Sequence, residues 1–426
     1  MNYIQYIDQN REKMISTLVK LIETPSPDLG PTTAQEIVLQ ELTALGFETE
    51  SFRGDPDKVR DDPDFCDPGV SYDPGAYNVA GRLKGSGDLP SLMLFAHIDT
   101  EAADAFGNMM HPFTAERKGG RICGLGAADD KGGIAMMLEA VRTALHFCPD
   151  LKYDLTVLSI LGKHGGAYGT LTAMQKGYNA ANTLYLHPAE TGHGFQEIKN
   201  ISLGVADLKI TITGEPGIPH DDLSPGVNAN NILGKMLIWL SDYESKMQSE
   251  HRFDYGSFKG QPSFMINVGS VSSGTAGYGE IAQKAEMRLR CRFDSPLTPD
   301  SIFKDIYCFL KQKTDMEGLS GYWNMEYGGM KATPARVDNS HPFVRMVQRS
   351  VSEICGQKEF IHQYHAGSDI RFPMVCGGSN CVGIGPSCTL PERGTEGIEW
   401  IDEEEYITGI KILTDLLLRY ADYTQD

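Results

Sequence analysis

Short apolar runs alternate with amphipathic segments through the first 190 residues, and this alternation restricts the fold more than any other feature. The runs "SLMLFA", "LTVLSIL" and "NTLYL" have the length of strands, whereas the segment around Ile134, Leu138 and Val141 repeats with the spacing of a helix. Fully apolar strands that alternate with helices are typical of a largely parallel sheet covered on both faces. The sequence therefore predicts an α/β fold, an α/β/α sandwich with a mixed, largely parallel sheet.

The pattern changes near residue 200 and returns near residue 330. Between these points, longer alternating strands such as "IAQKAEMRLRCRF" are interleaved with the helical segments "ANNILGKMLIWLSDY" and "TPDSIFKDIYCFLKQKT". Alternation with a period of two indicates strands that expose one face. We therefore expect residues 1–200 and 331–426 to form one α/β domain, interrupted by an α+β domain at 201–330.

Two further segments carry predictions about local structure. The spacing of Ile4, Ile7, Met14, Leu18 and Leu21 predicts one helical face near the N-terminus. The segment 53–76 is rich in Asp, Pro and Gly and has no periodicity, which indicates a long polar loop, either an active-site flap or a contact surface.

The composition excludes several classes of partner. The net charge of -19 argues against non-specific binding to nucleic acid or to an anionic membrane, since both need clustered Lys and Arg. The sequence has neither a signal-peptide pattern at its start nor an apolar run approaching about 20 residues. Its nine cysteines form no CxxC pair and suit reduced thiols. We expect a cytoplasmic protein that acts on a small molecule.

Three histidines stand at or just after the ends of predicted strands. His97 ends "LMLFA", His164 follows "VLSIL" by two residues, and His187 ends "TLYL". Ligands of open α/β sheets gather beyond the carboxyl ends of the strands. One such histidine is more often structural than functional, but three at equivalent places indicate a site. Asp99, two residues after His97, is placed to orient the imidazole, although it also fits an ordinary surface position.

Asp129 lies in "GLGAADDKGG", just before a predicted helix. Its carboxylate can ligate a metal ion; alternatively the motif is an acidic N-cap, with Asp129 or Asp130 meeting the helix dipole. His97, Asp129 and His187 form a set of two imidazoles and one carboxylate. Such a set suits Zn, Mn, Fe or Co and leaves coordination positions for water and substrate.

The order of motifs resembles one known family. "HIDT", "GLGAADDKGG", the glycine-rich "GGAYGT", "PHDDLSPGVNANN", "AGSD" and "GIGP" follow one another over nearly the whole chain. They resemble the dinuclear zinc metallopeptidases, a family that includes acetylornithine deacetylase, succinyl-diaminopimelate desuccinylase, aminoacylase, peptidase T and carboxypeptidase G. The resemblance implies a metal-binding α/β catalytic domain and a smaller ferredoxin-like lid domain, often used for dimerisation. It therefore implies a homodimer or higher homo-oligomer.

The resemblance also implies roles for single residues. His97 is similar to the family's histidine on the first metal, Asp99 to its orienting neighbour and Asp129 to the bridging carboxylate. His220 is similar to the lid histidine that stabilises the oxyanion. Two more positions fall near the family's substrate pocket, Arg292 and Asp369.

The departures from the family pattern concern the metals. Lys163 and His164 replace two glutamates, the general base and a ligand of the second metal, and His187 replaces an acidic ligand. Near the C-terminus, only Thr395 or Glu396 stands where the family has a histidine. Lys in place of Glu and two His in place of acids make the pocket four charge units more positive, and two adjacent divalent ions would repel strongly there.

We therefore expect one divalent ion, Zn, Mn, Co or Fe, on His97, Asp129 and His187, with His164 as a fourth ligand or as a partner of bound water. A metal-activated water can hydrolyse a C–N bond of a small carboxylate-bearing substrate without the glutamate base. Lys163 acts as a base only as a neutral amine; as an ammonium, it would hold a substrate carboxylate or a developing oxyanion. The alternative is an inactive relative that binds a ligand or has a structural role.

Overall fold

The chain divides into two compact units. Unit 1 contains residues 1–201 and 336–426, and unit 2 contains residues 202–335. The computed structural model describes residues 1–27, 33–54, 56–62, 64–65, 75–101, 111–163, 166–189, 192–218, 223–274, 277, 279–364, 368–389 and 399–423.

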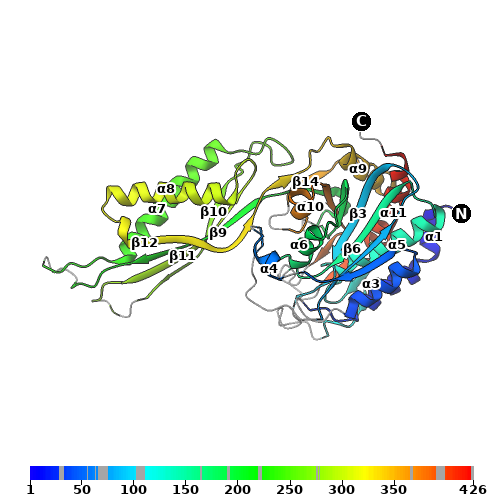
Figure 1. Cartoon of the computed structure of the whole chain (residues 1–426), viewed down its shortest axis with the longest axis horizontal. Helices are drawn as coiled ribbons and strands as arrows, with labels where there is room; N and C mark the ends of the chain where they lie inside the picture. Colours follow the sequence, from blue (N-terminus) through cyan, green and yellow to red (C-terminus); the bar gives the residue numbers. More distant parts are fainter. Residues whose placement is uncertain are drawn as a thin grey trace. The chain divides into compact units, whose positions relative to one another are not determined.

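Unit 1 is built on a mixed sheet whose centre is parallel (Figure 1). Within the described residues its path is β1 (Glu48–Phe52), β2 (Asn78–Leu83), β6 (Tyr153–Ile160), β3 (Leu89–His97), β7 (Asn182–Leu186), β15 (Asn380–Ile384), β8 (Glu197–Ser202) and β13 (Ala335–Arg336), with β14 (Ile361–Tyr364) paired to β8. The pairs β6·β3, β3·β7 and β7·β15 are parallel, whereas β1·β2 and β2·β6 are antiparallel. The predicted mixed, largely parallel sheet is confirmed.

Helices cover both faces of this sheet. The helices of unit 1 are α1 (Tyr3–Gln9), α2 (Arg11–Ile22), α3 (Thr33–Ala44), α4 (Pro56–Arg60), α5 (Lys131–Phe147), α6 (Tyr168–Gln175), α9 (Pro342–Cys355), α10 (Arg371–Val375) and α11 (Glu403–Arg419), with 3-10 turns η1 (Gly194–Gln196) and η3 (Tyr420–Asp422). Alternate residues of β3 pack in two different hydrophobic cores, one on each face of the sheet, because successive side chains of a strand point to opposite faces. Leu92 and Leu94 pack in the core that includes α2, α3, α5, α9 and α11, whereas Met93 and Phe95 pack in the other. The α/β/α sandwich follows from this alternation.

A small antiparallel sheet lies beside the start of α5. Its strands are β16 (Cys388–Thr389), β17 (Trp400–Asp402), β5 (Arg121–Cys123) and β4 (Glu116–Lys118). It pairs the segment that precedes α11 with the segment that precedes the Asp129 turn. Parts of the chain that are far apart in sequence are thereby held together near the strand ends.

Unit 2 has a ferredoxin-like topology. Its elements follow in the order β9 (Gly204–Thr213), α7 (Ala229–Glu250), β10 (Met265–Ser273), β11 (Lys284–Phe293), α8 (Pro299–Met316), η2 (Ser320–Tyr322) and β12 (Trp323–Ala332). The sheet order β10-β11-β9-β12 is antiparallel throughout, as expected for a βαββαβ unit. Met287, Leu289 and Cys291 of β11 lie in the core with α7 and α8, and Arg288 and Arg290 are exposed. Unit 2 is therefore an α+β unit in which two helices pack on one face of a four-stranded antiparallel sheet.

Two local expectations were wrong. The N-terminal helix is two helices, because Asn10 ends α1 by donating its side-chain amide to the carbonyl of Tyr6 at 2.8 Å, and α2 begins at Arg11. The polar segment 53–76 contains the short helix α4.

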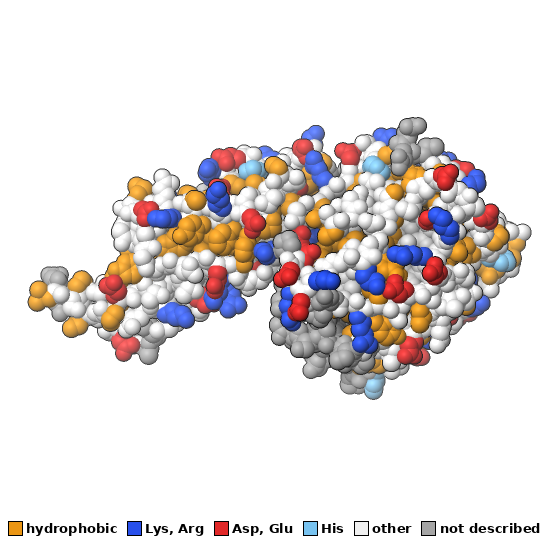
Figure 2. Space-filling model, viewed as in Figure 1, with side chains coloured by type: hydrophobic (Ala, Val, Ile, Leu, Met, Phe, Trp, Pro, Cys, Tyr) orange, Lys and Arg blue, Asp and Glu red, His pale blue; other side chains and the backbone are white. Residues whose placement is uncertain are grey.

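The surface mixes both signs of charge. Figure 2 shows Lys and Arg side chains interspersed with Asp and Glu side chains on the visible face, rather than gathered by sign. Among the described residues, every helix is too short or too polar to span a bilayer.

Candidate metal centre

The parallel register brings His97 and His187 together. β3 lies between β6 and β7, and Phe95 pairs with Tyr185. Continuing the same register by two residues places His97 level with His187. Their ring centroids are 6.2 Å apart, and both rings are fully buried. The two histidines therefore meet because neighbouring parallel strands end at the same edge of the sheet.

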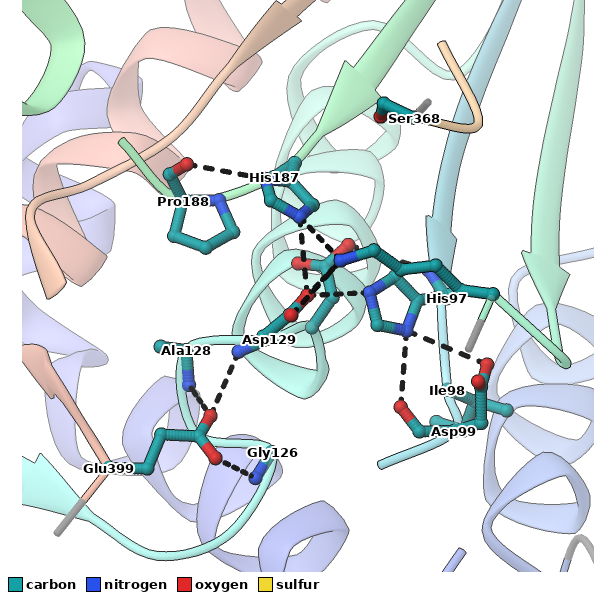
Figure 3. A network of polar contacts seen from close by, with 12 residues as sticks. His97, Ile98, Asp99, Gly126, Ala128, Asp129, His187, Pro188, Ser368 and Glu399 are labelled. Atoms are coloured by element: carbon teal, nitrogen blue, oxygen red, sulfur yellow. Dashed lines mark hydrogen bonds and ion pairs between the residues drawn. The ribbon is translucent and has the colours of Figure 1, made fainter. Parts of the chain in front are cut away.

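Asp129 faces both histidines from the turn before α5. Its Oδ1 lies 2.6 Å from His97 Nε2 and 3.2 Å from His187 Nε2 (Figure 3). Gly133, in the first turn of α5, permits this approach, because a Cβ there would lie 2.6 Å from the carbonyl oxygen of Leu186 at the end of β7. The start of α5 thus packs directly against the end of the strand that carries His187.

The outer nitrogen of each imidazole is held by a backbone carbonyl. His97 Nδ1 lies 3.1 Å from the carbonyl oxygen of Asp99 and 3.5 Å from its Oδ1, and His187 Nδ1 lies 3.2 Å from the carbonyl oxygen of Pro188. Both Nε2 atoms consequently point at Asp129. Asp99 thus lies beside His97, and its backbone carbonyl makes the shorter of its two contacts with Nδ1.

Glu399 holds the turn that presents Asp129, and sequence reasoning missed it. Its carboxylate accepts the backbone N–H groups of Gly126 and Ala128 at 2.8 Å each and that of Asp129 at 2.9 Å (Figure 3). Burial raises the pKa of Glu399 to about 7, against the lowering effect of these N–H donors. The available signal was an acidic residue in "GIEW", directly before an apolar strand.

Lys163 places a positive charge on the same group of atoms. Its Nζ lies 2.7 Å from Oδ1 and 3.0 Å from Oδ2 of Asp129, and 2.8 Å from His187 Nε2. Burial alone would lower the pKa of Lys163, but the charge and hydrogen bonds of Asp129 outweigh it and raise the pKa. Lys163 is therefore an ammonium here, which argues against its use as a neutral base.

The remaining charges of the centre follow from burial and from Lys163. Burial raises the pKa of Asp129, but the positive charges of Lys163 and His97 hold it well below its usual value. Burial and Lys163 hold the pKa of His187 well below its usual value, so His187 is a neutral acceptor. Burial and Lys163 also lower the pKa of His97, but Asp129 outweighs them and the pKa is about 10.

Lys199 is a second buried lysine that sequence reasoning missed. Its ammonium donates to the carbonyl oxygen of Pro188 and, at 3.3 Å, to that of His187; it also lies 3.1 Å from His187 Nδ1 and 3.7 Å from Glu197. It therefore fixes the chain that carries the His187 ring. The signal in the sequence was a charged residue within the buried run "EIKNIS".

The other predicted residues are distributed differently. Asp369 lies in unit 1, fully buried, and burial raises its pKa against the opposing charges of His97 and Lys163. Arg292 lies on β11 in unit 2. Four predicted or considered residues fall outside the described residues: His164, His220, Thr395 and Glu396.

The donor atoms suit a divalent ion. One ligand atom each from His97, Asp129 and His187 lies within 4.8 Å of the other two. No second group of this kind is found among the described residues. Two imidazole nitrogens and one carboxylate oxygen fit Zn, Mn, Co or Fe. Asp129 and Lys163 keep about 15% of their side-chain surface exposed, at 14% and 16%, so the centre is reachable from solvent.

The α/β/α unit, the ferredoxin-like unit and this two-histidine, one-carboxylate group define a protein of the metallopeptidase and amidohydrolase class. The chain belongs to the peptidase family M20/M25/M40, whose model matches residues 93–419. The family assignment made from the motifs is confirmed.

Relatives named for an enzymatic activity align with nearly the whole chain. It is 23% identical over 449 aligned residues to N-formyl-4-amino-5-aminomethyl-2-methylpyrimidine deformylase of Bacillus subtilis, covering 97% of this chain and 96% of the relative. It is also 23% identical over 414 aligned residues to succinyl-diaminopimelate desuccinylase of Variovorax paradoxus, covering 94% and 95%. The first relative is named for the removal of a formyl group and the second for the removal of a succinyl group.

Solved structures share the fold at low sequence identity. Aminopeptidase PepT of Bacillus cereus superposes with a TM-score of 0.74 at 18% identity, over 97% of this chain and 99% of that chain. The YXEP protein of Bacillus subtilis, described as a dinuclear metal-binding peptidase, superposes with a TM-score of 0.66 at 14% identity, over 98% of this chain and 100% of that chain.

Proposed function

We propose that this protein is a metal-dependent hydrolase that cleaves a C–N bond, an amide or an amine, in a small carboxylate-bearing molecule. The observation that carries the proposal is the meeting of His97 and His187, at the carboxyl ends of parallel strands, with Asp129 from the turn before α5, in a chain of this family. The N-formyl and succinyl groups named for the relatives support an N-acyl substrate. We propose one divalent ion per chain.

The proposed metal ligands are His97, Asp129 and His187, with His164 as a further candidate. A divalent ion held there would supply Lewis-acid activation of water. Asp99 fixes the His97 ring, and Glu399 fixes the turn that carries Asp129. The centre is therefore preorganised by contacts that do not involve the ligand atoms themselves.

Lys163 has the charge for a substrate-binding role. As a buried ammonium it stabilises negative charge that develops on a substrate carbonyl oxygen, or it binds a substrate carboxylate. His220 is proposed as a second oxyanion donor, and Asp369 and Arg292 as residues that shape the substrate pocket. We also propose a cytoplasmic location and a homodimer or higher homo-oligomer formed through unit 2, acting as a lid.

One observation favours a second candidate. Lys163 contacts two of the three proposed ligand residues and thereby neutralises part of the group without any ion. A family member in which this contact is permanent would be catalytically inactive and would act as a binding or structural protein.

Activity screening separates the two candidates. Metal-free protein would be given Zn²⁺, Mn²⁺, Co²⁺ or Fe²⁺ and assayed on N-formyl and N-succinyl amines, N-acyl amino acids, dipeptides and amino-aromatic compounds. We expect turnover of at least one N-acyl compound, its loss in His97→Ala, and its retention in His111→Ala, a matched change at an exposed histidine. No turnover, or turnover unaffected by His97→Ala, would favour the inactive candidate.

A further inference from the structure

Lys163 reaches the proposed metal ligands with its charged atom. Its Nζ lies between 2.7 and 3.0 Å from both carboxylate oxygens of Asp129 and 2.8 Å from His187 Nε2. These are the distances of charge-assisted hydrogen bonds. The centre offers four possible ligand atoms: the two carboxylate oxygens and the two Nε2 atoms. One ammonium group contacts three of them.

An ion on the same atoms needs the same space. Zn²⁺ lies about 2.0–2.2 Å from imidazole nitrogens and carboxylate oxygens. Its ligands here would include Asp129 Oδ1 and His187 Nε2, the two atoms that Lys163 contacts most closely. An ammonium nitrogen and a divalent ion cannot share these atoms, because their excluded volumes overlap and their charges repel.

The position of Lys163 in the chain allows it to leave. It stands on the turn after β6, beyond the last residue of the strand, Ile160, and its side chain is 16% exposed. By contrast, the rings of His97 and His187 are fully buried and held through their Nδ1 atoms. In an exchange of cations, the lysine is therefore the group that moves.

We propose that Lys163 is a built-in competitor for the metal: its ammonium occupies the centre formed by Asp129 and His187 in the metal-free protein, and a divalent ion binds only by displacing it. This inference rests on the proposed metal centre. It makes the lysine a tethered cation that keeps Asp129 neutralised when metal is scarce and raises the metal concentration needed for loading.

Metal titration of charge-removing variants tests the competition. Metal-free wild type, Lys163→Met and Lys163→Arg would be titrated with Mn²⁺ and, separately, Zn²⁺ by calorimetry. Lys84→Met is the matched control, because Lys84 is exposed and pairs with Asp154 near the start of β6, the opposite end of the strand from Lys163. We expect Lys163→Met to bind at least about tenfold more tightly than wild type, and Lys163→Arg and Lys84→Met to stay within about threefold.

Thermal unfolding supplies a second readout. Without metal, Lys163→Met should melt at a lower temperature than wild type, because Asp129 has lost a positive partner; with saturating Mn²⁺ its melting temperature should rise by more than that of wild type. Lys163→Gln, which keeps hydrogen-bonding capacity without charge, replaces Lys163→Met if that variant does not fold.

The outcomes separate this inference from the proposed function. Equal or weaker metal binding by Lys163→Met than by wild type would overturn the competition and leave the metal centre intact. Absence of metal binding by wild type and by every variant would overturn the proposed metal centre itself, and the competition with it.

Discussion

Glu399 accepts the backbone N–H of Asp129 at 2.9 Å, although 270 residues separate them in sequence. The same carboxylate accepts the N–H groups of Gly126 and Ala128. The side chain therefore orients the turn that presents the proposed metal ligand, and it does so from the residue just before strand β17, which pairs with β5. The geometry of the centre depends on this long-range contact.

Replacing Glu399 should loosen that turn. Glu399→Ala leaves three N–H groups without their acceptor, so we expect a loss of about 2–4 kcal/mol in the free energy of unfolding and weaker metal binding. Urea unfolding and calorimetric titration with Mn²⁺ measure the two effects. Glu404→Ala, at a largely exposed residue paired with Arg11, is the matched control and should change stability by less than about 0.5 kcal/mol. A Glu399→Ala protein as stable as the control would contradict the role of Glu399.

The metal content should be one divalent ion per chain. Mass-spectrometric metal analysis of purified protein should find one equivalent, and removal by a chelator should lower the melting temperature, because an ion that binds only the folded state stabilises it. His97→Ala should lose the ion, whereas His111→Ala should retain it. Two equivalents in the wild type, or none, would contradict the mononuclear centre.

Lys163→Glu should not restore a two-metal dipeptidase. It returns one carboxylate to the position after β6, but His164 and His187 remain, and the family's C-terminal histidine is still absent. The second ion would therefore lack ligands. Hydrolysis of a dipeptide panel with two equivalents of Zn²⁺, Mn²⁺ or Co²⁺ measures this. Robust dipeptidase activity that requires the second equivalent would show that a dinuclear site can form.

The cap of α9 should depend on pH. His341 Nδ1 accepts the backbone N–H of Phe343 at 3.2 Å, and burial lowers the pKa of His341 below 6.5, against the raising effect of Asp338. A lowered folded-state pKa contributes stability above the unfolded value of about 6.5, and this contribution is lost as the pH falls through the folded-state pKa.

His341→Asn tests this cap, because Asn accepts the same hydrogen bond without titrating. The free energy of unfolding would be measured with urea at pH 7.5 and at pH 5.5. Between these pH values the wild type should lose more of it than the variant does. The difference should be up to about 1 kcal/mol, the usual contribution of an N-cap. Equal pH dependence in the two proteins would contradict a titrating cap.

Much of the α/β framework could be predicted from the sequence because parallel strands obey a simple rule. His97 and His187 end apolar runs, and the register of β3 and β7 brings such ends together. The break at Asn10 could not be predicted from apolar spacing, since that spacing continues across both α1 and α2. At the break, the backbone of Asn10 leaves helical geometry and its side chain bonds to the backbone of the preceding turn.

The missed parts of the centre depend on three-dimensional contacts. Glu399 and Lys199 act on backbone groups that lie beside them only in the folded chain. The substitution at Lys163 was visible in the sequence, but its contact with both Asp129 and His187 depends on the path of the turn after β6 and on its side-chain conformation. Position along a chain identifies candidates, whereas the direction of a long side chain requires coordinates.

The order of strands has a consequence for synthesis on the ribosome. Within the described residues, β7 pairs with β3, which precedes it, and with β15, which is made almost 200 residues later. The whole of β9 to β12 emerges in between, so unit 2 can fold while one edge of β7 is still unpaired. An unpaired central strand is a site for wrong association. The nascent chain is therefore most vulnerable between the emergence of β7 and that of β15, and a pause there would favour aggregation.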